Sequence, residues 1–166
     1  MRDRFVAIVK TFIVGCLLWI TGSFALTVLT SFALGIYYFL TEGYSKMGLS
    51  FLEALLQIVP MIFQGVLGLP FLLAYAFRWG VLYYWYIGGS LSGIYLVICR
   101  EFSISRTSKL WLAFVLWLLQ IVAYVMLGTP VNYRDVEIGE HIAYYFLPMA
   151  GGTLLNYYYA RRTALQ

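Results

Sequence analysis

The residues best suited to chemistry lie in the stretch NYRDVEIGEH, residues 132–141. It holds Arg134, Asp135, Glu137, Glu140 and His141, the last being the only histidine of the chain. Because His141 follows Glu137 by four residues, the two side chains would face each other on a helix. Three carboxylates beside an imidazole could ligate a metal ion or supply a general acid and base. Their spacing matches no metal motif such as H-E-x-x-H, so we interpret the stretch as a solvated acidic loop and a candidate partner-contact surface.

Motifs of other chemistries are missing from the sequence. It has no phosphate-binding glycine loop, no nucleophile elbow and no zinc-protease motif. The two cysteines, Cys16 and Cys99, form no C-x-x-C pair and lie in apolar sequence, which is typical of small buried side chains. We therefore predict a protein that is not an enzyme, with no catalytic residue, no metal and no cofactor.

Composition indicates the kind of element that carries these residues. The chain of 166 residues is 63% hydrophobic and 11% charged, with a mean hydropathy of +0.84, whereas a soluble domain carries about 25% charged residues. Its apolar runs are continuous, and many of its 32 aromatic residues gather near the ends of those runs, as in the aromatic belts of membrane proteins. We predict an all-α polytopic membrane protein, with residues 1–166 forming a single transmembrane helical domain. Nucleic acid is not a predicted partner, because the basic residues form no cluster with aromatics on a soluble face.

The positions of the basic residues help to predict the number of membrane spans. Five charge-poor segments cover residues 11–41, 54–77, 79–99, 110–128 and 142–160, and a span needs about 20 apolar residues. Five spans would divide the basic residues almost equally between the two sides. If residues 49–99 cross only once, eight of the 11 basic residues share one side, as the positive-inside rule demands. These eight are Arg2, Arg4, Lys10, Arg100, Arg106, Lys109, Arg161 and Arg162.

We accordingly predict four full spans plus a broken or re-entrant segment at residues 51–77. Both termini would be cytoplasmic, in the inner membrane of a bacterium. A total of five ordinary spans stays open. So does a total of six, in which the first segment bends at Gly22 and Ser23.

The segment at residues 51–77 is the candidate path for a solute. Proline removes a backbone donor and glycine weakens a helix, so four such residues within a short stretch predict a kink or a re-entrant turn. The candidate lining residues are Gln57, Pro60, Gln64, Gly65, Gly68 and Pro70. Gln57, Gln64, Gln120 and Asn156 are the polar side chains expected to be buried.

The predicted function follows from short loops and small residues. Gly89 and Gly93 have the spacing that lets two membrane helices approach closely, within the chain or with a partner. We predict a small membrane protein that acts by protein–protein interaction, as an accessory subunit or an immunity-type factor. Its partners would be the lipid bilayer and another membrane protein or a second copy. The alternative is a small transporter or channel subunit for an uncharged or amphipathic solute.

Overall fold

The computed structural model describes residues 2–43, 46–53, 55–58, 60, 62, 81–102, 104–126 and 146–163. These residues form helices and turns with no strand, which confirms the all-α prediction. The principal elements are α1 (Arg2–Tyr38), the π-helix η1 (Phe39–Gly43), α4 (Val81–Glu101), α5 (Arg106–Met126) and α7 (Leu147–Thr163).

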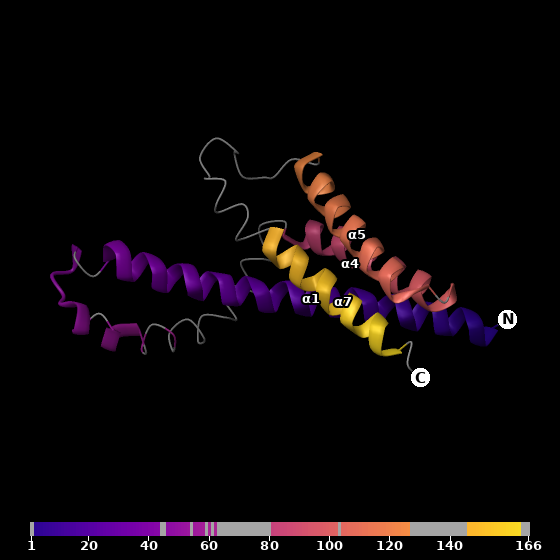
Figure 1. The fold of residues 1–166 in the computed structure, drawn as a ribbon, viewed down its shortest axis with the longest axis horizontal. Helices are drawn as coiled ribbons and strands as arrows, with labels where there is room; N and C mark the ends of the chain where they lie inside the picture. Colours follow the sequence, from indigo (N-terminus) through magenta and orange to yellow (C-terminus); the bar gives the residue numbers. More distant parts are fainter. Residues whose placement is uncertain are drawn as a thin grey trace.

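Helix α1 is the longest element and organises the others. Its 37 residues correspond to about 55 Å at the usual rise of 1.5 Å per residue. It continues through Gly22 and Ser23, so the bend required by the six-span alternative does not occur. Helix α1 begins and α7 ends at the same end of the helical assembly, and α4, α5 and α7 pack near the N-terminal half of α1 (Figure 1).

Glycines set the distance between the helices. A Cβ atom on Gly15 of α1 would lie 2.7 Å from the Cα of Gly93 on α4. Further along α1, a Cβ on Gly22 would lie 2.7 Å from the carbonyl oxygen of Gly151 on α7. From Phe12 to Trp19 along α1, the contacted residue of α4 moves back from Gly93 to Gly88. From Gly15 to Gly22, the contacted residue of α7 moves back from Asn156 to Gly151. Helices α4 and α7 are therefore both antiparallel to α1. Small residues allow such close backbone approach, which replaces the hydrophobic driving force that helices lack inside a bilayer.

Within the part of the chain that the structure describes, two helices are long and apolar enough to cross a membrane. One covers Arg2–Thr41 and the other is Arg106–Met126. This finding weakly supports a membrane location, and it does not confirm the predicted four to six spans.

Helix α5 separates its residues into two faces. Lys109, Ala113, Leu116, Gln120 and Tyr124 are buried against the other helices. The opposite face exposes large apolar side chains, namely Leu110, Trp111, Phe114, Val115, Leu118, Leu119, Val122 and Val125. Such a continuous apolar face is unusual on a protein surrounded by water.

The segment after η1 contains a capped helical turn. Residues 51–53 and 55–58 are helical, as are residues 60 and 62. Ser50 and Glu53 form a capping box, in which the backbone N–H and hydroxyl of Ser50 donate to Oε2 of Glu53 at 2.8 and 2.7 Å. Most of residues 51–77 lie outside the described residues, so the prediction of a kinked or re-entrant segment there stays a prediction.

Candidate functional site

The antiparallel packing brings the charged helix ends together. Helix α1 begins, α4 ends, α5 begins and α7 ends at one end of the assembly, which we call the basic end. The contacts that establish this are Arg100 of α4 with Thr11 of α1, and Lys109 of α5 with Ala160 of α7. The eight basic residues grouped by the charge count lie at or near these four helix ends.

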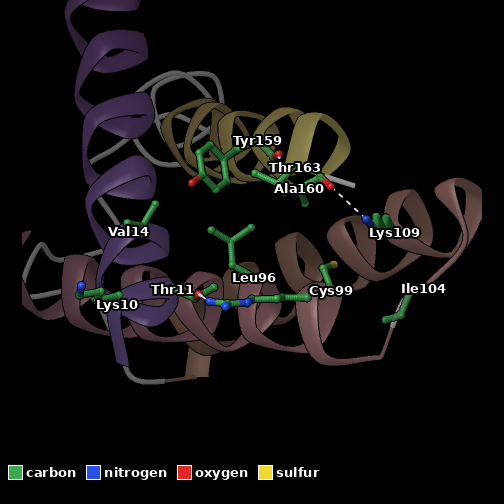
Figure 2. A pocket seen from close by; sticks show the side chains of 11 residues that line it. Lys10, Thr11, Val14, Leu96, Cys99, Ile104, Lys109, Tyr159, Ala160 and Thr163 are labelled. Atoms are coloured by element: carbon green, nitrogen blue, oxygen red, sulfur yellow. Dashed lines mark hydrogen bonds between the residues drawn. The ribbon is translucent and has the colours of Figure 1, made fainter. Parts of the chain in front are cut away.

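A cavity of about 700 Å³ lies between the helices at the basic end (Figure 2). Its walls come from α1, α4, α5, α7 and the turn between α4 and α5. Three cationic side chains line it, one from each of three helices, namely Lys10, Arg100 and Lys109. Apolar and hydroxyl-bearing side chains complete the wall, including Val14, Leu96, Ile104, Thr11, Tyr159 and Thr163.

Backbone carbonyls and a hydroxyl group hold two of these cations in place. Nη1 of Arg100 donates to the carbonyl oxygen of Ala7 at 2.9 Å and to Oγ1 of Thr11 at 2.6 Å. Nζ of Lys109 donates to the carbonyl oxygen of Ala160 at 2.9 Å. Ala160 lies in the last turn of α7, where unpaired carbonyls carry the negative end of the helix dipole and favour a cation. Lys109 is 4% exposed, so its ammonium group is fixed rather than solvated.

No carboxylate is among the described residues that line this cavity. Glu101 directly follows the lining residue Arg100 in the sequence, and its Oε2 accepts hydrogen bonds from Arg4 at 2.7 and 3.2 Å. That ion pair is formed outside the set of lining residues. The cavity therefore concentrates positive charge that no acidic wall residue neutralises.

A second polar constellation, which we call the polar core, lies deeper between the helices. Nε1 of Trp19 donates to Oε1 of Gln120 at 3.1 Å, and Nε2 of Gln120 donates to Oγ1 of Thr153 at 3.4 Å. Nδ2 of Asn156 donates to the carbonyl oxygens of Gly15 and Gly152. Gln120 and Asn156 are 2% and 0% exposed, which confirms the prediction that both are buried.

Two buried side-chain oxygen atoms lack a hydrogen-bond partner among the described residues. They are the hydroxyl of Ser92 and Oδ1 of Asn156. All the groups in this constellation are neutral, so it can join helices by hydrogen bonds but offers no group that ionises easily.

A shallow apolar groove of about 180 Å³ lies between α5 and α7, on the outside of the assembly. Its small residues are Ala113, Ala150 and Thr153, and Phe114 and Trp117 are among its aromatic walls. Leu110, Leu154 and Tyr157 complete it.

The predicted partner-contact glycines are engaged within the chain. A Cβ on Gly93 would lie 2.6 Å from Cδ2 of Phe12, and one on Gly89 would lie 3.8 Å from Cys16, both on α1. A partner would have to displace α1 to reach this face. Gly89 and Gly93 therefore pack against α1 within the chain, and their contact with a partner stays a prediction.

The remaining predicted site residues divide into two groups. Gln57 and Pro60 are described and exposed, so Gln57 is not the buried residue that we expected. The other members of both predicted sites lie outside the described residues. These are Gln64, Gly65, Gly68, Pro70, Arg134, Asp135, Glu137, Glu140 and His141.

The basic cavity was not predicted from the sequence, although its signal was present. The count of basic residues on each side of the membrane groups Lys10, Arg100 and Lys109 together. It does not reveal that these side chains, from three helices, line one cavity. Among the described residues, no three His, Cys, Asp or Glu side chains are placed to hold a metal ion.

No known protein family, curated protein or solved structure matches this chain.

Proposed function

We propose that this chain is an integral membrane protein that acts by binding a transmembrane helix of another membrane protein. We place it in a bacterial inner membrane with both termini on the cytoplasmic side. The observation that carries the proposal is the outer face of α5, where large apolar side chains flank a groove with small residues at its floor.

Membrane placement is supported by the distribution of exposed side chains. Trp111, Phe114 and Leu119 are 64%, 45% and 51% exposed on α5, and water would disfavour such a surface by roughly 25 cal/mol per Å². Lipid removes that cost. The basic residues at one end of the assembly agree with a cytoplasmic surface under the positive-inside rule.

The groove between α5 and α7 supports an interaction with a helix. Inside a bilayer, helices associate through close packing rather than through the hydrophobic effect, and small residues permit that packing. Ala113, Ala150 and Thr153 provide a small-residue floor, while Phe114 and Trp117 provide walls that a partner side chain could contact. Thr153 is already held by its bond to the carbonyl oxygen of Met149, so the floor is rigid.

Photo-crosslinking tests the proposal directly. A benzoyl-phenylalanine residue would replace Phe114 at the groove, and in a matched control it would replace Trp111, which is exposed on α5 outside the groove. We expect a discrete protein adduct from position 114 and only lipid adducts from position 111. An adduct of twice the mass of the chain would identify the partner as a second copy. Equal adduct patterns at both positions would refute a specific protein contact.

A variant that fills the groove gives an independent test. Ala150→Leu adds three carbons to the groove, whereas Ala33→Leu makes the same change at an exposed position on α1. We expect Ala150→Leu to abolish the adduct at position 114 and Ala33→Leu to leave it unchanged. Persistence of the adduct in Ala150→Leu would show that the partner does not occupy the groove.

A further inference from the structure

We propose that the basic cavity binds the phosphate group of an anionic phospholipid. The first argument is charge. Lys10, Arg100 and Lys109 line the cavity from three helices, and none of the described residues that line it is acidic. Positive groups held together without a counter-charge repel one another, and an anion among them relieves that repulsion.

The second argument concerns hydrogen-bond donors. An ammonium group has three N–H donors, and the carbonyl oxygen of Ala160 takes one from Lys109. Arg100 has five N–H donors, and its contacts with Ala7 and Thr11 use only Nη1. The ammonium group of Lys10 forms no ion pair or hydrogen bond within the part of the chain that the structure describes. Several charge-assisted donors therefore remain for phosphate oxygens, which are the acceptors that such donors bind most strongly.

The third argument is the shape of the wall. Val14 of α1 and Leu96 of α4 point into the cavity, and Tyr159 and Thr163 of α7 add hydroxyl groups to its wall (Figure 2). Thus the cavity pairs phosphate-binding groups with an apolar surface, and it is partly open to the surroundings. A phospholipid presents the same combination, with a phosphate next to its first acyl carbons, whereas inorganic phosphate has no apolar part.

The other charges at the basic end leave the cavity positive. Asp3 and Glu101 are the acidic residues of the four helices at this end. Glu101 is paired with Arg4, and neither acidic residue lines the cavity. Arg106, Arg161 and Arg162 lie nearby and are exposed, so they add a general attraction for anions without forming the cavity wall.

The binding of phosphate to this site is independent of the proposed partner interaction, whereas a lipid as its source rests on the proposed membrane placement. The test uses full-length protein in a non-ionic detergent, with phosphatidylglycerol, phosphatidylcholine and inorganic phosphate as separate probes. Native mass spectrometry measures the affinity for each lipid, and the melting temperature reports binding of inorganic phosphate. The variant Lys10→Gln removes an exposed cavity cation, and Arg106→Gln removes an equally exposed cation outside the cavity.

We expect phosphatidylglycerol to bind saturably and more tightly than phosphatidylcholine. Loss of one charge-assisted bond in Lys10→Gln should weaken that binding about tenfold, while Arg106→Gln should leave it within about twofold, as for a distant screened charge. Binding of inorganic phosphate alone, with the same dependence on Lys10, would overturn the lipid as source and assign the site to a soluble phosphate. Equal affinity for the two lipids without phosphate binding, or equal weakening by the two substitutions, would overturn the site itself. The crosslinking at position 114 reads the partner interaction separately, so failure of one proposal does not imply failure of the other.

Discussion

The indole Nε1 of Trp19 donates a 3.1 Å hydrogen bond to Oε1 of Gln120, although 101 residues separate them in the sequence. Trp19 is 1% exposed and Gln120 is 2% exposed, so the bond is shielded from any solvent. On either side of the indole, the closeness of Gly88 on α4 and Gly152 on α7 leaves no room for a Cβ. Trp19 of α1 therefore contacts all three of the other long helices at one point.

Substitutions at this pair should be strongly coupled. Gln120→Leu leaves the buried indole N–H without an acceptor, which should reduce the free energy of unfolding by about 1–3 kcal/mol. Trp19→Phe removes the donor and should leave the amide of Gln120 short of one bond. Because the double variant leaves neither group unpaired at this contact, it should cost less than the sum of the single variants. Equilibrium unfolding in mixed micelles measures the cycle, and additive costs would contradict a direct interaction.

The glycines of α1 provide a matched comparison within one helix. A Cβ at Gly15 would meet the backbone of Gly93 at 2.7 Å, whereas a Cβ at Gly35 would meet nothing within 4 Å. Gly15→Ala should lower stability by about 1–3 kcal/mol, because backbone atoms must move apart. Gly35→Ala should leave stability unchanged or raise it by up to about 1 kcal/mol, since alanine favours the helix. Thermal melting in detergent measures both, and equal effects would show that α1 and α4 do not pack through Gly15.

Some of this architecture could be predicted from the sequence, because the lengths of the apolar runs and the positions of the charges carry it. Continuous apolar runs predicted helices, and the charge count grouped the eight basic residues that the structure places at one end. Gln120 and Asn156 are predicted to be buried because each lies within a long apolar segment, where its amide can form hydrogen bonds only with neighbouring helices. These signals are local or additive, so they need no knowledge of which helices touch.

The central role of Trp19 could not be predicted in the same way. Aromatic residues near the ends of apolar runs are typical of the membrane interface, whereas Trp19 lies in the core beside Gly88 and Gly152. Its partner Gln120 is brought to it because α4 and α7 each pack against both α1 and α5, an arrangement that no local pattern encodes. The Ser50–Glu53 capping box follows the local pattern S-x-x-E, but it was not among the sequence-based predictions.

That capping box predicts a pH effect. The backbone N–H of Ser50 and then its hydroxyl donate to the Glu53 carboxylate and hold its pKa below the ordinary value. A lowered folded pKa means that the carboxylate stabilises this turn at pH values above its ordinary pKa, and the stabilisation is lost as the pH falls through the lowered value. Carboxyl-carbon NMR titration should report the lowered pKa. Ser50→Ala removes only the hydroxyl contribution, so the pKa should rise partway, while Ser108→Ala should leave it unchanged. An unaltered pKa in Ser50→Ala would contradict the capping geometry.

Side-specific cysteine labelling tests the orientation of the helices in a membrane. Helix α1 and η1 together extend far beyond the roughly 30 Å of a hydrocarbon core, so Met47, which follows them, should lie on the side opposite to the basic end. In a chain with Cys16→Ala and Cys99→Ala, an impermeant thiol reagent should label Met47→Cys in intact cells. Ser105→Cys and Thr163→Cys, both exposed at the basic end, should react only after lysis, because the positive-inside rule predicts that this end is cytoplasmic. Labelling of Ser105→Cys and Thr163→Cys from opposite sides would contradict the shared basic end. Labelling of Met47→Cys and Ser105→Cys from the same side would mean that α1 does not cross the membrane.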